Sequence, residues 1–177
     1  MENFYEKLSR KIYNLLLKEV KDRMKILDVG CGDCEIDFYL AQKRRHLKIL
    51  GIDLGIPKKI RKVKNSFVKC IKGDASALLN SKKEKFDIVI SKYSLHEFSK
   101  PRKVLESCYK VLKENGKIII IDFIKNSLAE KLWGEDYFSI KQIKKMLKEL
   151  KFKEIKGYLL TKEGPAIIMG LKITKFS

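Results

Sequence analysis

The sequence has few of the features that mark a membrane protein or a disordered chain. Proline occurs only 3 times in 177 residues, and we find no internal repeat and no Pro- or Ser-rich linker. The longest apolar runs, such as residues 117–124, are far shorter than the ~20 residues that span a membrane. Residues 1–10 include acids and have no apolar core, so we expect no signal peptide. We therefore predict one globular domain over residues 1–177 and no membrane partner.

Cysteine and histidine are scarce as well, with 4 and 2 residues. Four irregularly spaced cysteines do not suggest a disulfide framework, so we expect a reducing, cytoplasmic setting. Cys31 and Cys34 have the C-x-x-C spacing of half a zinc site, but such a site needs about four ligands. Cys70 and Cys108 fall on a predicted strand and on the apolar stripe of a predicted helix, where core packing is the simpler interpretation. We therefore predict no metal site.

Acidic residues are outnumbered by basic ones, 22 to 40, which gives a net charge of +18. A basic surface can bind an anionic partner such as RNA, and residues 141–153 are an especially basic stretch. The bases are mostly lysines spread over nearly every segment among glutamates, which is also the composition of heat-adapted proteins. The sequence leaves both interpretations open.

The periodicity of the apolar residues predicts alternating strands and helices. Strands are expected at residues 25–30, 48–53, 66–74, 85–92, 117–123, 152–161 and 166–174. Helices are expected at residues 3–23, 35–45, 101–113 and 139–150, with a short basic helix after Pro57 and a short helix or turn at 75–80. This order predicts a doubly wound α/β domain: a mostly parallel seven-stranded sheet with helices on both faces and an antiparallel C-terminal hairpin.

Acidic residues follow the first three predicted strands, where ligands of doubly wound sheets bind. Asp28 precedes a glycine turn formed by Gly30 and Gly32, which allows a tight bend and close approach of a ligand to the backbone. Asp53 lies about 20 residues further on, the usual distance for a carboxylate that binds ribose hydroxyls. Asp74 ends the third strand. This repeated placement indicates a nucleotide-like ligand.

These motifs, together with others along the chain, resemble those of the class I S-adenosylmethionine-dependent methyltransferases. The resemblance rests on "ILDVGCG", "GIDL", "GDA", "FDIVIS", "LHEF" and "VLKENGKIIIID", which match in order and spacing over residues 24–123. After the fourth strand there is neither an Asp/Asn-Pro-Pro-aromatic motif nor a Pro-Cys, which argues against exocyclic-amine and cytosine C5 methylation. The pattern is nearest the small-molecule group that includes ubiquinone/menaquinone methyltransferases.

The resemblance implies that S-adenosylmethionine is the cofactor and S-adenosylhomocysteine the product. Gly30 and Gly32, with Cys31 between them, would lie under the methionine part, and Asp28 would lie near its amino group. Asp53 would hold the ribose hydroxyls.

The remaining cofactor contacts implied by the resemblance come from the ends of the next strands. Leu54 would pack on the adenine, Asp74 would accept from its amino group and the backbone of Ala75 would read the ring edge. Ser91 would line the floor where methyl and acceptor meet. The structural alternative is that the aspartates are helix caps and turn formers. Cys34 stands where the family commonly has glycine, so we expect an unusual loop geometry there.

His96 is our candidate catalytic base, because it follows the fourth strand on the expected acceptor side and histidine titrates near neutrality. The alternative is a histidine that shapes the pocket or caps a helix. Lys92 and Tyr93 are candidate substrate-binding residues, and the helix within residues 1–23 is a possible lid.

Three functions are compatible with the sequence. The first is methyl transfer, by in-line displacement, to a small-molecule acceptor. The second is methylation of RNA (tRNA or rRNA) by means of the basic surface, although the chain has no separate RNA-binding module. The third is a non-catalytic cofactor-binding or scaffold protein.

Overall fold

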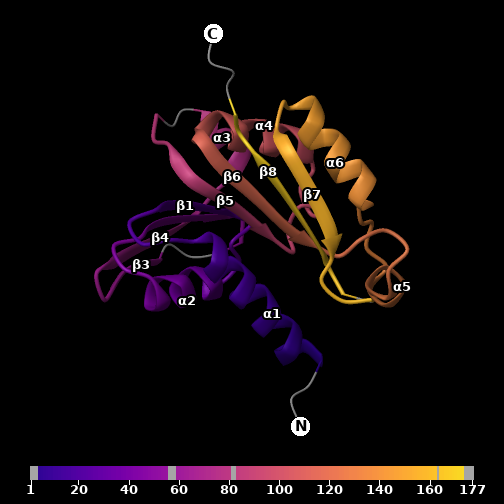
Figure 1. Ribbon diagram of the computed structural model, residues 1–177, viewed down its shortest axis with the longest axis horizontal. Helices are drawn as coiled ribbons and strands as arrows, with labels where there is room; N and C mark the ends of the chain where they lie inside the picture. The colour runs from indigo at the N-terminus through magenta and orange to yellow at the C-terminus, as the bar shows by residue number, and fades with distance from the viewer. Residues whose placement is uncertain (1–3, 56–58, 81–82, 163, 174–177) are drawn as a thin grey trace.

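The computed structural model describes residues 4–55, 59–80, 83–162 and 164–173. Parts of the predicted elements at residues 3, 57, 163 and 174 lie outside the described residues. The strands form one sheet in the order β3-β4-β2-β1-β5-β6-β8-β7 (Figure 1). Their bounds are β1 Lys25–Val29, β2 Lys48–Asp53, β3 Lys59–Val63, β4 Ser66–Lys72, β5 Phe86–Lys92, β6 Leu112–Asp122, β7 Lys153–Leu159 and β8 Ala166–Leu171.

The central strands β4, β2, β1, β5 and β6 run parallel, while β3, β8 and β7 pair antiparallel to their neighbours. The chain leaves β1 toward β2 and β4 on one side, and returns to β5 and β6 on the other. The switch in strand order therefore lies between β1 and β5. In doubly wound sheets this is where the ligand crevice opens, outside the carboxyl ends of the strands.

Helices cover both faces of the sheet, as Figure 1 shows. α1 and α2 pack on one face, while α3, α4 and α6 pack on the other. Among the described residues, no helix combines the length and the apolarity needed to cross a membrane. The helix bounds are α1 Phe4–Glu19, α2 Glu35–Lys43, α3 Ala75–Asn80, α4 Pro101–Val111, α5 Leu128–Trp133 and α6 Ile140–Glu149.

The isoleucines of β6 show how the core divides into two layers. Ile118 and Ile120 pack with the helices α3, α4 and α6, whereas Ile119 and Ile121 pack with α1 and α2. All four are fully buried. Successive side chains of a strand point to opposite faces, so a strand covered on both faces needs an unbroken apolar run. The core thus fixes β6, and with it the residues that follow, against β5.

The doubly wound fold is confirmed, but three elements differ from the prediction. Residues 59–63 form a strand, β3, and not a helix, so the sheet has eight strands. The reason is the tight turn at Lys64–Asn65, which folds β3 back on β4 with Val63 opposite Ser66. α5 was not predicted, and β6 begins at Leu112, within the stretch predicted as the end of the preceding helix.

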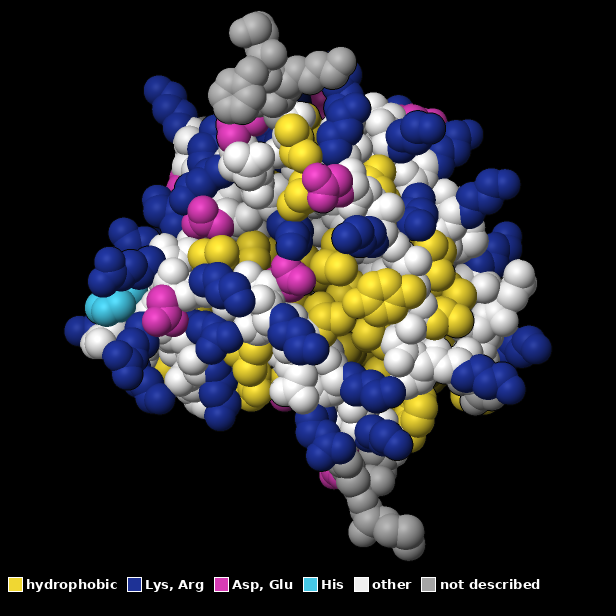
Figure 2. All heavy atoms as spheres, viewed as in Figure 1, with side chains coloured by type: hydrophobic (Ala, Val, Ile, Leu, Met, Phe, Trp, Pro, Cys, Tyr) yellow, Lys and Arg dark blue, Asp and Glu magenta, His cyan; other side chains and the backbone are white. Residues whose placement is uncertain are grey.

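Basic side chains are spread widely over the surface. Figure 2 shows Lys and Arg scattered across the whole visible face, with few acids among them and an apolar area left uncovered near the centre. They do not form a single stripe on this face. A dispersed charge of this kind suits solvation of the whole domain, whereas nucleic-acid binding usually shows as a basic patch or stripe.

Candidate active site

A cavity of about 610 Å³ opens at the carboxyl ends of β1, β2 and β4. Among its lining residues are five of the predicted cofactor-binding residues: Gly30, Asp53, Leu54, Asp74 and Ala75. They come from three different strand ends, so the parallel sheet brings together residues up to 45 positions apart in the chain. The cavity is large enough for a nucleotide-sized ligand.

The two glycines of the loop after β1 are needed for different reasons. Gly30 has a φ of 71°, and a Cβ there would lie only 2.3 Å from the Cβ of Ser94. Gly32 has a φ of 52° but faces open space. Ser94 donates to the carbonyl of Val29 (2.9 Å) and contacts the Ser91 hydroxyl at 2.8 Å. Ser91 is thus buried in a hydroxyl pair that ties β5 to the glycine loop, and it is not among the lining residues of the cavity.

Asp53 joins the glycine loop to the end of β2. Its Oδ2 accepts a hydrogen bond from the Gly32 N–H at 2.9 Å, and its Oδ1 accepts one from the Gly55 N–H at 2.8 Å. An ionised carboxylate has about four acceptor positions, so each oxygen keeps room for one more donor. Asp53 therefore both positions the loop and presents acceptor capacity at the cavity.

Asp74 combines the two roles that the sequence left open. Its Oδ1 accepts from the Ser76 N–H and the Ser76 hydroxyl, both at 2.7 Å. These bonds, led by the one from the hydroxyl, lower the pKa of the Asp74 carboxyl. The residue is a turn former at the start of α3, as the structural alternative held, and it also lines the cavity.

Asp28 is a buried carboxyl group in need of a partner. It is only 1% exposed, and among the residues that the structure describes no donor reaches its Oδ1. Burial raises the pKa of Asp28 to about 7. The charge of Lys92 lowers this pKa, and the charge of Asp53 raises it further. A buried carboxylate without a hydrogen bond is costly. Asp28 is not among the lining residues of the cavity, and its contact with the ammonium of a bound cofactor stays a prediction.

A second cavity, of about 260 Å³, has mainly aromatic walls. Glu97 lines both cavities, which are therefore neighbours. Tyr93 stacks on Phe123 at 5.2 Å between ring centroids, and Trp133 meets Phe123 edge-on at 5.1 Å. The aromatic lining comes from the ends of β5, β6 and α5, from the loop after α5 and from α1: Tyr5, Tyr93, Phe123, Trp133 and Tyr137.

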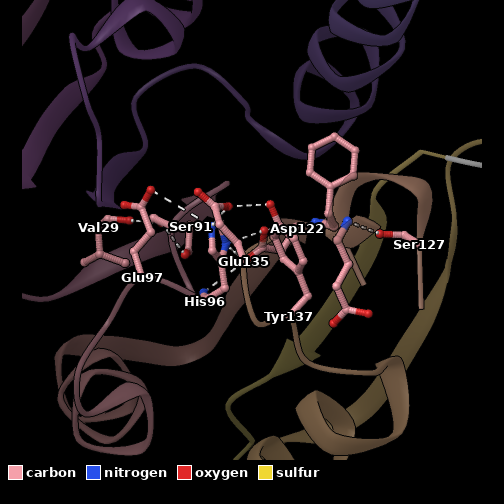
Figure 3. Close-up of polar contacts among 11 residues, drawn as sticks. Val29, Ser91, His96, Glu97, Asp122, Ser127, Glu135 and Tyr137 are labelled. Carbon is pink, nitrogen blue, oxygen red and sulfur yellow. Dashed lines mark hydrogen bonds and ion pairs between the residues drawn. The ribbon is translucent and has the colours of Figure 1, made fainter. Parts of the chain in front are cut away.

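His96 lies in this second cavity between two carboxylates (Figure 3). Its Nδ1 is 2.9 Å from Oδ1 of Asp122, and its Nε2 is 3.1 Å from Oε2 of Glu135. The Tyr137 hydroxyl donates to Glu135 at 2.6 Å, and Glu97 is 4.0 Å from Nε2. Burial alone would lower the pKa of His96, but the hydrogen bond and charge of Asp122, with the charges of Glu135 and Glu97, raise it. A histidine held this way favours the protonated imidazolium.

Asp122, Glu135 and Tyr137 were not predicted from the sequence. Asp122 had a usable signal, because it ends the fifth predicted strand as Asp28, Asp53 and Asp74 end or follow theirs. Glu135 and Tyr137 lie in a loop after α5, a helix that was not predicted.

Lys92 and the helix α1 are the remaining candidates. Lys92 lies 5.0 Å from the Tyr93 ring centroid and acts electrostatically on Asp28, but it is not among the lining residues of either cavity. Tyr5 brings α1 to the second cavity. Tyr13, further along α1, stacks on Tyr39 at 4.4 Å. The role of α1 as a lid stays a prediction.

The cysteines depart most from expectation. Cys34 has a φ of 66°, in the left-handed region that glycine adopts easily and other residues rarely adopt. The backbone of the turn therefore keeps the conformation of a glycine, and the cysteine is held there under strain. Cys34 and Cys70 form a disulfide, which the scattered spacing did not predict. The two cysteines meet because β4 pairs with β2 and lies directly under the start of α2. The separation of the cysteines in the sequence does not reveal this arrangement. The Cys31 side chain points toward the same place and not into the large cavity.

Comparison with known proteins gives a consistent result. A family model described as "Methyltransferase domain" matches residues 20–164. Phosphoethanolamine N-methyltransferase 1 of Zea mays is 32% identical over 111 residues, which cover 60% of this chain and 22% of that protein. Demethylmenaquinone methyltransferase of Thermotoga maritima is 30% identical over 103 residues, 56% of this chain and 44% of that protein. The chain therefore spans less than half the length of these relatives.

A solved structure supports the fold independently. Phosphoethanolamine N-methyltransferase 2 of Haemonchus contortus, in complex with phosphomonomethylethanolamine and S-adenosylhomocysteine, superposes with a TM-score of 0.70 at 15% identity. The match covers 92% of this chain and 53% of that one. The family match spans most of the chain, and the cavity lies at the carboxyl ends of the strands, where doubly wound sheets bind their ligands. The chain belongs to the methyltransferase domain family, as a class I S-adenosylmethionine-dependent methyltransferase domain.

Proposed function

We propose that this domain transfers a methyl group from S-adenosylmethionine to a small-molecule acceptor bound in the aromatic cavity. The observation that carries the proposal is the pair of adjacent cavities that share Glu97. One is sized and lined for a nucleotide-like cofactor, and the other, at about 260 Å³, suits a compact acceptor.

The cofactor would be held by residues from three strand ends. Asp28 would receive the ammonium of the methionine part, Asp53 the ribose hydroxyls, and Leu54 and Ala75 the adenine. The bound cofactor supplies a methyl group on a sulfonium, which is already activated for displacement. The main task of the protein is then to align the acceptor with that methyl group.

The chemistry of the second cavity favours a neutral or cationic acceptor with a flat or apolar body. Its aromatic walls offer stacking and cation–π contacts. Three carboxylates, Asp122, Glu135 and Glu97, surround His96, so the cavity is locally acidic in a strongly basic domain. Carboxylates repel phosphate groups, and this is why we favour a small molecule over RNA as the acceptor.

His96 would act as the base for an acceptor that carries a proton. It can do so only when Nε2 has no proton and its contact with Glu135 is released. The Glu135 side chain is 47% exposed, whereas that of Asp122 is 2% exposed, so Glu135 is the partner that an acceptor displaces. Asp122 would stay in place, hold the Nδ1–H tautomer and stabilise the imidazolium after proton transfer.

The test is transfer of a labelled methyl group from S-adenosylmethionine into a cell extract that has been separated into RNA, protein and small molecules. We expect label in the small-molecule fraction, and its loss with His96→Gln while calorimetry still shows binding of S-adenosylhomocysteine. Label in RNA that disappears after nuclease treatment would overturn the choice of acceptor. Cofactor binding without transfer to any fraction would instead support a non-catalytic domain.

A further inference from the structure

Three cysteines and one aspartate gather under the glycine loop, outside both cavities. Cys31, Cys34, Asp37 and Cys70 are all buried, and one ligand atom from each lies within 4.8 Å of the others. The sulfurs of Cys31 and Cys34 are 3.6 Å apart, and Cys70 Sγ is 3.8 Å from Oδ2 of Asp37. The residues come from the loop after β1, the start of α2 and the middle of β4.

The environment of Asp37 is unusual for an acidic side chain. Asp37 is 0% exposed, and within the described part of the chain its Oδ1 has no hydrogen-bond partner. The nearby charge is of the same sign, since Asp28 acts on Asp37 electrostatically. Bringing an unpaired carboxylate into the interior is costly unless a cation or a metal ion compensates it. A carboxyl group among three sulfurs is a set of donors that one metal ion can share.

Gly51 of β2 makes room for the side chains of this cluster because it has no side chain of its own. A Cβ on Gly51 of β2 would lie 2.7 Å from Cys31 Sγ and 2.8 Å from Asp37 Oδ2. Gly51 pairs with Asp28 on one side and with Cys70 on the other. Glycine at this position thus admits the side chains of the cluster to the centre of the sheet.

We propose that in the reduced chain Cys31, Cys34, Cys70 and Asp37 bind one Zn²⁺. A tetrahedral site with Zn–S bonds of ~2.3 Å sets its sulfurs ~3.8 Å apart. The Cys31–Cys34 distance of 3.6 Å is already close to this value. Thiolates select zinc over the hard ions Mg²⁺ and Ca²⁺. Four protein ligands leave no open position, so the site is structural and not catalytic.

The disulfide between Cys34 and Cys70 must first be reduced. A phosphine reductant supplies two electrons and takes up the oxygen of one water molecule, becoming a phosphine oxide. The two protons of that water go to the two sulfurs, which become thiols. Zn²⁺ then displaces the thiol protons, which are released to solvent, and binds the thiolates.

The experiment compares the full chain before and after phosphine treatment. Each form is incubated with Zn²⁺, separated from free metal by gel filtration and analysed for zinc. We expect about one zinc per chain in the reduced form and none in the oxidised form, which lacks two of the sulfurs. Co²⁺ in place of Zn²⁺ should give the visible absorption of a tetrahedral thiolate site. A reduced chain that holds no more zinc than the oxidised chain would overturn the proposal.

Variants assign the ligands. Cys70→Ser and Asp37→Asn should each weaken zinc affinity by ~100-fold or more, because losing one of four ligands should cost at least as much as losing an outer-shell partner. Cys108→Ser is the matched control, since Cys108 is also buried but lies on α4, outside the cluster. An equal loss with Cys108→Ser would refute the assignment. Should the ligand variants fail to fold by circular dichroism, the thiolate absorption of the Co²⁺-loaded wild type still decides whether three sulfurs bind.

Discussion

Replacing Asp53 with alanine gives the sharpest test of the cofactor site. In the structure the carboxylate holds Gly32 and Gly55 and keeps acceptor capacity toward the cavity. Hydrogen bonds to a charged group contribute ~1.5–3 kcal/mol each. Because Asp53 is partly exposed, we take the lower value for each of two ribose hydroxyls, which gives ~3 kcal/mol. Since every ~1.4 kcal/mol is tenfold, Asp53→Ala should weaken S-adenosylhomocysteine binding by ~100-fold.

Isothermal titration calorimetry measures this loss, and two controls separate its causes. Asp33→Ala removes a carboxylate from the same loop, one that accepts from the Glu35 N–H and is absent from the cavity lining, so it should change affinity little. An S-adenosylhomocysteine analogue without ribose hydroxyls should bind Asp53→Ala and wild type alike. A loss below ~5-fold, or an equal loss with the analogue, would show that Asp53 acts on the loop and not on the ribose.

Three further predictions concern charge and backbone. Burial raises the pKa of Asp28 from 3.8 to about 7, so the free protein should lose stability as pH rises through this window, by on the order of 4 kcal/mol at pH 8. Asp28→Asn should remove that loss, which chemical denaturation at several pH values measures. The carboxylates raise the pKa of His96 above 6.5, the usual pKa of a histidine, so turnover should increase as pH rises above 6.5. Glu135→Gln removes one of these charges and should move the pH–rate profile to lower pH. Gly32→Ala should reduce the free energy of unfolding by ~1–2 kcal/mol, the cost of a left-handed backbone. Gly30→Ala should cost more, because there the added Cβ also collides with Ser94, and thermal unfolding compares the two variants.

The sequence was most informative where local pattern and topology agree. Alternating strands and helices predicted the sheet, and the rule for its carboxyl ends placed Gly30, Asp53 and Asp74 on one cavity. β3 escaped prediction because its apolar alternation is interrupted by three basic residues, and Pro57 before it suggested a helix start. Propensity was there outweighed by pairing with β4.

Contacts between distant segments could not be predicted from spacing. Asp122 lies 26 residues from His96, and Asp37 lies 33 residues from Cys70, yet each pair is in contact. Such pairs depend on which strands become neighbours, and a single sequence determines this only through the whole fold. The sequence therefore named His96 as a candidate but not Asp122 and Glu135, which contact its ring nitrogens.

The order of the strands gives the lysines a further use. β3 and β7 are the two outermost strands, and an outermost strand exposes unpaired backbone groups to which another chain can add. β3 carries Lys59, Arg61 and Lys62, and β7 carries Lys153 and Lys156. The positive charges on two such edge strands repel each other, so the sheets of neighbouring molecules are kept from pairing. Part of the +18 charge thus protects the domain from aggregation at the two places where its sheet is open.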